Sequence, residues 1–271
     1  EHSKMYIRNV QMNKESEITQ AIIKTNPYMV EESVWSAGGT DVVVSFPIIP
    51  HEKSIYKDDL LGVKHLELVK KAQKHWVNAG TNEELCADKG VRHNVSNTII
   101  VDDWDEVEKY VFENRYSFSG ISFLGMSGDK DYNQAPNTAV ITAGEMVKKY
   151  DSAAIFASGM VVDALKVFPN LWLACSTAQG WGMDISLESA ENAARQDWVR
   201  RFKNFAENYC GSNVIRAEHC LKDAYLLHKW NKIQANLKPM TWQEDLTEKK
   251  YTDVDTLGAA ACAGGSCDID F

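Results

Sequence analysis

The stretch Asn94-Val-Ser-Asn-Thr-Ile-Ile-Val101 decides the fold class, together with Gly120-Ile-Ser-Phe-Leu124 further along the chain. Both are short runs rich in β-branched and aromatic residues, which predicts two strands. Between them, Asp102 or Asp103 can cap a helix over residues 104–115. A strand, a helix and a second strand within about 30 residues make a βαβ unit, so the two strands are expected to be parallel. The chain is therefore predicted to be an α/β protein.

Two helices around this unit have apolar residues at helical spacing. The helix over 104–115 is expected to bury Trp104, Val107, Val111 and Phe112. A longer helix, capped by Asp58 or Asp59 and running through Asn78, is expected to bury Leu66, Val69, Ala72 and Trp76.

The amino-terminal part adds two more strands. Residues 4–12 alternate between apolar and polar, and Asp41–Phe46 is a β-branched run that ends at Pro47. A short helix is expected over 15–25, and Trp35-Ser-Ala-Gly-Gly39 is expected to be a loop.

Beyond Thr142 the sequence predicts helices only. The two longest are expected over 187–209 and 217–237, and each has an aromatic or aliphatic stripe at i, i+4, i+7 and i+11. Such stripes belong to a hydrophobic core more often than to a ligand pocket. They consist of Trp198, Phe202, Phe205 and Tyr209, and of Leu226, Trp230, Ile233 and Leu237.

Composition narrows the class of protein. The 271 residues are 44% hydrophobic and 25% charged, as in ordinary globular proteins. The net charge of −9 argues against a groove that follows nucleic-acid phosphates. No apolar run approaches the ~20 residues of a membrane helix. Scattered cysteines and the lack of a signal peptide predict a cytoplasmic protein. The charge and the short apolar runs predict that it binds neither nucleic acid nor a membrane.

The carboxyl-terminal segment Gly258–Phe271 contains two thiols, Cys262 and Cys267, separated only by Ala, Gly and Ser. Small and flexible residues do not form a packed element, so a mobile arm is expected. An arm with two cysteines suits thiol–disulfide exchange. Two other interpretations remain open: an inert tail, or half of a zinc site, which would need two more ligands although no Cys or His follows Cys267.

Two polar segments are candidates for ligand binding. His93, Asn94 and Asn97 lie at the entrance to a predicted strand, where they could bind a polar ligand or cap a loop. The loop Gly125–Tyr132, which leads to Gln134-Ala-Pro136, leaves the carboxyl end of a strand, where α/β proteins build ligand sites. A solvated surface loop is the alternative. No metal site is expected, and neither a phosphate-binding glycine motif nor a serine-hydrolase motif occurs.

Several segments, taken in order, resemble one family. They are His2–Arg8, Val44-Ser-Phe-Pro47, His93-Asn-Val-Ser-Asn-Thr98, Gly120–Leu124, Gln134-Ala-Pro136, Trp242 and the Cys262/Cys267 pair. Together they resemble the carboxyl-terminal third of the adenosylcobalamin-dependent (class II) ribonucleotide reductases, in particular the monomeric type that reduces ribonucleoside triphosphates. The likeness runs over essentially the whole chain.

The resemblance implies the last part of a ten-stranded α/β barrel at 1–141, a mainly helical region at 142–251 and a flexible redox tail at 252–271. The strands near 4–12, 41–46, 95–101 and 119–124 would then share one sheet with an unpaired edge. Cobalamin would contact the segments at about 96–157 and 216–255. Its contacts would include His93, Asn94, Ser96, Asn97, Thr98, Gln134, Ala135 and Pro136.

The reaction implied is the reduction of ribonucleoside triphosphates to deoxyribonucleotides by thiyl-radical chemistry. Cys262 and Cys267 would relay electrons from thioredoxin to the active site. The family's radical cysteine and phosphate-binding loop belong upstream, so the chain is expected to be a fragment or one piece of a split enzyme, inactive without its upstream half. The alternatives are a cobalamin-binding module without redox work and a domain that only completes the barrel.

Overall fold

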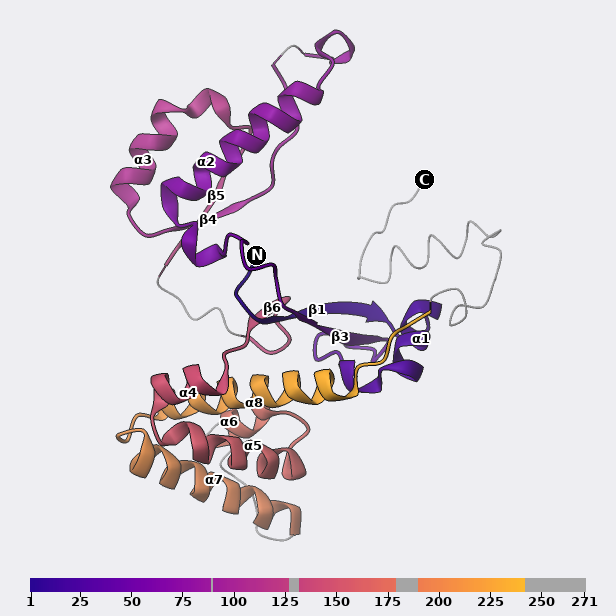
Figure 1. Cartoon of the computed structure of the whole chain (residues 1–271), viewed down its shortest axis with the longest axis vertical. Helices are drawn as coiled ribbons and strands as arrows, with labels where there is room; N and C mark the ends of the chain where they lie inside the picture. The colour runs from indigo at the N-terminus through magenta and orange to yellow at the C-terminus, as the bar shows by residue number, and fades with distance from the viewer. Residues whose placement is uncertain (89, 127–131, 179–189, 242–271) are drawn as a thin grey trace. The chain divides into compact units, whose positions relative to one another are not determined.

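The computed structural model describes residues 1–88, 90–126, 132–178 and 190–241. The chain divides into two compact units (Figure 1). Unit 1 consists of Glu1–Lys4 and Pro50–Asp131, and unit 2 of Met5–Ile49 and Tyr132–Phe271. This grouping cuts across the predicted boundary at residue 141, because the first strands belong with the later helices. Residues 252–271, predicted to be a tail, lie outside the described residues.

Unit 1 contains the predicted βαβ unit. Strand β4 pairs in parallel with β5, and Asp103 caps the intervening helix by accepting hydrogen bonds from the backbone N–H groups of Asp105 and Glu106. The elements are η2 (Lys57–Asp59), α2 (Gly62–Ala72), η3 (Gln73–Asn78), η4 (Glu83–Leu85), β4 (Thr98–Val101), α3 (Trp104–Glu113), η5 (Arg115–Ser117) and β5 (Ser122–Gly125). The parallel arrangement predicted from the sequence is confirmed.

The core of unit 1 is formed by Leu66, Val69, Ile99, Val101 and Val107. Three aromatic residues predicted for this core are exposed instead: Trp76 by 83%, Trp104 by 55% and Phe112 by 68%.

A change of helical winding explains the exposure of Trp76. The segment Gln73–Asn78 is a π-helix, which has i→i+5 hydrogen bonds. Its wider winding turns Trp76 away from the face that Leu66 and Val69 set in α2. The other two errors have a different origin: Trp104 is the first residue of α3 and contacts Phe123 of β5, with 6.2 Å between ring centroids, and Phe112 lies under the guanidinium of Arg115.

Unit 2 contains a separate antiparallel sheet with the strand order β2-β3-β1-β6. Its elements are β1 (Tyr6–Asn13), α1 (Glu17–Thr25), η1 (Pro27–Met29), β2 (Val30–Glu32), β3 (Asp41–Ile48) and β6 (Asn137–Ala139). The expectation of one sheet that includes β1, β3, β4 and β5 is therefore wrong. The described strands form two open sheets of an α/β protein, and they do not close into a barrel.

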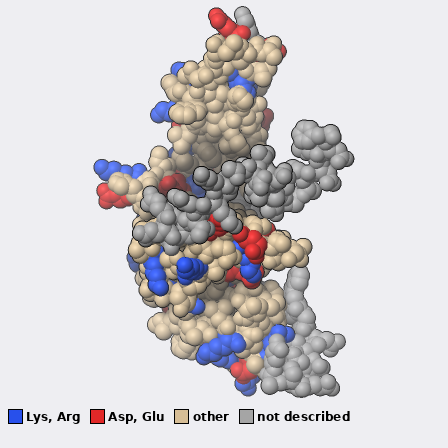
Figure 2. All heavy atoms as spheres, turned by 90° about the vertical axis from the view of Figure 1, so that its right-hand side faces the viewer, with Lys and Arg blue, Asp and Glu red and all other residues tan. Residues whose placement is uncertain are grey.

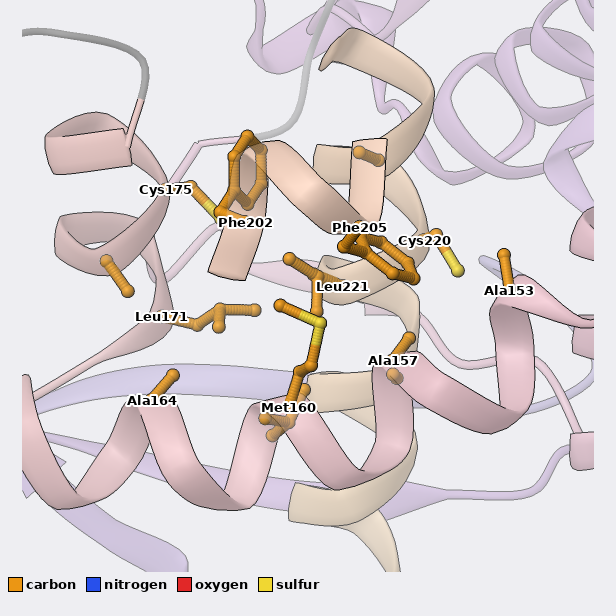
Figure 3. Packing of buried hydrophobic residues seen from close by; sticks show 14 of the residues in the cluster. Ala153, Ala157, Met160, Ala164, Leu171, Cys175, Phe202, Phe205, Cys220 and Leu221 are labelled. Atoms are coloured by element: carbon orange, nitrogen blue, oxygen red, sulfur yellow. The ribbon is translucent and has the colours of Figure 1, made fainter. Parts of the chain in front are cut away.

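Five helices follow the sheet in unit 2: α4 (Ala143–Tyr150), α5 (Ala153–Val167), α6 (Leu171–Ala178), α7 (Ala190–Tyr209) and α8 (Val214–Asn236). Helix α5 packs most extensively against α8. Its buried face is lined by Ala153, Ala157 and Ala164, whose small side chains allow close approach, and Figure 3 shows them pointing toward the same interior as Leu171, Phe202 and Leu221.

Helix α8 belongs to both parts of unit 2. Ala217, Cys220, Leu221 and Ala224 lie in the bundle core, whereas Ile233 packs against Val42 and Val44 of β3. The carboxyl end of α8 is tied to the end of α1, since Asn26 Nδ2 donates to Lys238 O (3.1 Å) and Lys238 N donates to Asn26 Oδ1 (2.7 Å). The predicted core stripes are confirmed at Trp198, Phe202, Phe205, Leu226, Trp230 and Ile233, whereas Tyr209 and Leu237 are exposed.

The backbone conformation of Gly62, the first residue of α2, can be tested by substitution. It has φ of +48°, and a Cβ at this position would lie 2.5 Å from Asp102 Oδ1. Gly62→Ala is expected to lower the free energy of unfolding of unit 1 by roughly 1–3 kcal/mol, because L-residues are strained in this conformation. Urea denaturation followed by circular dichroism measures the loss.

Gly80→Ala in the same unit is the matched control, because a Cβ there meets nothing within 4 Å and the backbone is not left-handed. It should change the free energy of unfolding little. Equal stability of the two variants would contradict the strain assigned to Gly62.

Candidate functional site

The clearest site in unit 2 is a pocket of about 330 Å³ lined by Asn9, Gln11, Trp35, Val43, Tyr132, Gln134 and Pro136, called here the Trp35–Tyr132 pocket. Its floor comes from the paired strands β1 and β3, in which Gln11 lies opposite Val43. Its walls are two exposed aromatic rings, Trp35 and Tyr132, which meet edge to face at 79° with centroids 6.0 Å apart. A concave surface with aromatic walls and an amide floor is a typical binding site for a small molecule.

Gln134 fixes the shape of this pocket. Its backbone has φ of +60°, which is rare for a residue other than glycine. Its Nε2 donates to Glu31 Oε1 (3.1 Å) and Glu32 O (2.8 Å), and its Oε1 accepts from Val34 N (2.9 Å). Both polar atoms of the side chain are therefore engaged with strand β2 and the residues after it.

The two residues after Gln134 are also structural. The carbonyl of Ala135, a residue only 7% exposed, accepts from Asn9 Nδ2 (2.7 Å), and the carbonyl of Pro136 accepts from Asn9 N (2.9 Å). These bonds attach the segment to β1 just before β6 begins. The predicted cofactor contact at Gln134-Ala-Pro136 stays a prediction. The surface through which Gln134 and Pro136 could make such a contact is the wall of the pocket.

The second predicted segment, His93–Thr98, lies in unit 1 and leads into β4. The side chains of His93, Asn94, Ser96 and Thr98 are exposed. The segment lies at the amino end of the parallel pair, whereas ligand sites of open α/β sheets lie at the carboxyl ends. The two predicted segments thus belong to different units, and a single site that contains both stays a prediction.

His93 borders two hollows in unit 1. One, of about 690 Å³, is lined by His75, Trp76 and neighbouring residues of the π-helix, and the other, of about 490 Å³, includes Cys86 and Arg92. The backbone of His93 is held in place because its carbonyl accepts from Gln73 Nε2 (3.1 Å) and Ser119 Oγ (3.3 Å). The His93 ring is therefore exposed on a fixed backbone.

Asn97 has an unsatisfied acceptor. Its Nδ2 donates to Val95 O (2.6 Å), but its Oδ1 is buried without a hydrogen-bond partner in the described part of the chain. A buried polar atom of this kind is costly unless a donor reaches it. Among the predicted cofactor contacts, Asn97 is the one with a buried side-chain oxygen that has no partner among the described residues.

The described cysteines fall into two groups according to whether the thiol is buried. Burial raises the pKa of Cys175 and of Cys220 to about 12, and it also raises the pKa of Cys210. All three lie in the bundle core, where a thiolate would be poorly solvated. Cys86 is partly exposed and donates to Asn82 O (3.4 Å). The predicted redox pair, Cys262 and Cys267, lies outside the described residues.

The face drawn in Figure 2 shows both signs of charge among its described residues. On the face drawn in Figure 2, the described Lys and Arg residues lie among Asp and Glu. In the described ranges no three His, Cys, Asp or Glu side chains group as a metal site. No single described helix is long and apolar enough to span a bilayer. Among the described helices, α5 and α6 have that length and apolarity only when taken together, and they are bent by 96° relative to each other.

The pocket residues Asn9, Gln11 and Trp35 were not identified from the sequence, whereas Tyr132 ends the loop Gly125–Tyr132 that the sequence marked as a candidate site. The available signal was a tryptophan in the glycine-containing loop after Val34, together with a tyrosine just before Gln134. Aromatic residues in two loops suggest a binding surface only if the loops meet, and the sequence does not show that they do.

Comparison with known proteins finds no matching family model, no matching curated protein and no matching solved structure. The site therefore rests on its own geometry.

The grouping of the thiols predicts their reactivity. A thiol with a pKa of about 12 has roughly 1000-fold less thiolate at pH 8 than an unperturbed thiol. Brief treatment of the native chain with iodoacetamide, followed by peptide mass spectrometry, should label Cys86 and leave Cys175 and Cys220 unmodified. Denatured protein provides the control in which all are labelled. Labelling of Cys175 as fast as that of Cys86 would contradict its burial.

Proposed function

We propose that this chain is the carboxyl-terminal part of an adenosylcobalamin-dependent ribonucleoside-triphosphate reductase, and that Cys262 and Cys267 relay electrons from thioredoxin. The ordered motifs of the sequence are the basis of the proposal. The upstream half would supply the radical cysteine and the binding site for substrate phosphates, and would complete the ten-stranded barrel with strands of this chain.

One observation of the structure gives the main support. Cys175, Cys210 and Cys220 are buried with raised pKa values, so they are unsuited to thiol exchange at neutral pH. Cys86, the remaining described cysteine, is not part of a closely spaced pair. Exchange that needs two neighbouring thiols is thereby left to Cys262 and Cys267.

The exchange step balances without a further reagent. Reduction of the ribose 2′-carbon releases water and oxidises two active-site thiols of the upstream half to a disulfide. A thiolate of the Cys262/Cys267 pair attacks that disulfide, and the second thiol completes the exchange. The upstream thiols are regained, the pair becomes a disulfide, and the dithiol of thioredoxin reduces it.

The residues predicted to hold the cofactor fit it in chemical type. Cobalamin has neutral amide side chains, which suit the neutral donors and acceptors of Asn94, Ser96 and Thr98. Asn97 presents its Oδ1 less readily, because this atom is buried in the described part of the chain. When bound, adenosylcobalamin supplies the radical by homolysis of its cobalt–carbon bond. The role of these residues would be to orient the cofactor.

A module that only completes the barrel or holds cobalamin is a second candidate, favoured by the surface of β5. The side chains of Phe123 and Leu124 are 39% and 44% exposed, although they point to opposite faces of the strand. Parallel strands are normally covered on both faces. A two-stranded parallel sheet exposed in this way would gain stability from further strands or helices of a partner.

The redox role is tested in the complete enzyme, assembled with its upstream half. The double variant Cys262→Ser/Cys267→Ser should lose thioredoxin-dependent turnover but still convert about one substrate per active site after prereduction, because only the relay is removed. Cys86→Ser is the matched control and should remain active. Full thioredoxin-dependent activity of the double variant would reject the relay and leave the second candidate.

The cofactor contact is tested by spectroscopic titration with adenosylcobalamin, with and without the upstream half. Asn94→Ala, which removes an exposed amide among the predicted contacts, should weaken binding about 5-fold, the effect of one neutral hydrogen bond. Asn208→Ala, which removes an exposed side chain on α7 bonded to Asn204 O, should not change it. Unchanged affinity in Asn94→Ala would remove this residue from the contact.

A further inference from the structure

We propose that the Trp35–Tyr132 pocket binds an uncharged ligand that presents a flat ring and an N–H donor. This inference is argued from the geometry of the pocket alone, although Gln134 and Pro136 in its lining are also among the predicted cofactor contacts. It assigns a ligand class to Gln11 and Trp35, which the sequence did not identify, and to Tyr132, which ends a loop that the sequence marked as a candidate site.

The walls of the pocket favour a flat ring. Trp35 is 61% exposed and Tyr132 49% exposed, so both rings have faces that a ligand could cover. Their perpendicular planes offer a ligand the face of one ring and the edge of the other, the two favourable aromatic geometries. The indole Nε1 of Trp35 already donates to Asn133 O (3.1 Å), so the indole would act through its face.

The floor of the pocket has one oriented acceptor. Gln11 Nε2 donates to Asp41 Oδ2 (2.8 Å), and Asp41 is only 6% exposed. A carboxylate can only accept, so this bond fixes the amide with Oε1 on the opposite side from Asp41. Among the described residues, this Oε1 has no hydrogen-bond partner.

The other amides of the pocket are already engaged. Asn9 donates to Ala135 O (2.7 Å) and accepts from Ser45 Oγ (2.8 Å), and Gln134 is bonded at both of its polar atoms. Gln11 Oε1 is therefore the amide acceptor available to a ligand among the described lining residues. Gln11 is exposed, so a ligand that donates to this oxygen would replace water there.

The residues that line the pocket also disfavour a charged ligand. None of the described residues that line the pocket is acidic or basic at neutral pH. A carboxylate or phosphate would lose its hydration without gaining an ionic partner, and it would approach the buried carboxylate of Asp41 behind Gln11. Neutral ligands avoid this cost.

The pocket is formed before the ligand arrives. The bond from Val34 N to Gln134 Oε1 and the bond from the Trp35 indole to Asn133 O join the two loops that hold the aromatic walls. Lys229 of α8 lies 3.0 Å from Glu31, which in turn accepts from Gln134. Preorganisation of this kind lowers the entropy lost on binding.

Three small probes test the assignment on the full chain by saturation-transfer NMR. Benzamide has a neutral ring with N–H donors, methyl benzoate has the neutral ring without a donor, and benzoate has the ring with a negative charge. Benzamide should bind saturably in the millimolar range. Methyl benzoate should bind about 5-fold more weakly, for want of one hydrogen bond. Benzoate should not bind detectably.

Variants locate the binding. Gln11→Leu should weaken benzamide binding about 5-fold and abolish the preference over methyl benzoate. Trp35→Leu should weaken both neutral probes equally. Gln20→Leu, which changes an exposed glutamine on α1, should behave as the unmodified chain. Circular dichroism of each variant checks that it is folded.

Two results would overturn the proposal. One is an absence of saturable benzamide binding to the folded chain. The other is benzamide binding that is unchanged in both Gln11→Leu and Trp35→Leu, since the probe would then occupy a different place. Neither result would affect the relay assigned to Cys262 and Cys267, which is measured by turnover.

Discussion

The packing of α8 against two partners at once is the constraint on which unit 2 depends. Its first half supplies Cys220 and Leu221 to the bundle core, and Ile233 in its second half packs against β3. Asp223 on the same helix accepts from Lys149 Nζ (2.9 Å) and from the Tyr150 hydroxyl (2.7 Å), which fixes α4 as well. A helix shared in this way makes the sheet and the bundle one folding unit, although their sequences predict separate regions.

The same helix reaches the pocket through its polar side. Lys229 pairs with Glu31, Glu31 accepts from Gln134, and Gln134 accepts from Val34 N next to Trp35. The apolar face of α8 thus holds the sheet while a charged residue supports the loop that forms the pocket wall. The left-handed backbone of Gln134 is tolerated because these contacts hold it.

Local patterns predicted the elements of the chain better than their assembly. The βαβ unit followed from two β-branched runs and a capping aspartate, and Asp103 does cap α3. Helical periodicity predicted Trp76 to be buried, but the pattern assumes constant winding and the π-helix breaks that assumption. The strands β1 and β3 were predicted, but their antiparallel pairing joins distant segments and has no local signal. The strands β2 and β6 have three residues each, too few for a periodic signal.

The candidate site was harder to predict for a related reason. The pocket needs the register that places Gln11 opposite Val43 and the long-range bond between Val34 and Gln134, and neither is a local property of the sequence. For the thiols, by contrast, a local pattern in the sequence was enough to single out a pair. Spacing alone identified Cys262 and Cys267 as the pair to test, and the burial of Cys175 and Cys220 is what the structure adds.

The π-helix after α2 has a consequence for chain length. Six residues joined by i→i+5 bonds occupy the axial rise of a shorter α-helical segment, so the segment holds an extra residue within the helix. The wider winding leaves the indole of Trp76 on the surface of unit 1, where it borders the same hollow as His75 and His93. Because successive residues of an α-helix are about 100° apart, deleting one residue before Trp76 would move the indole still further from the face of Leu66 and Val69.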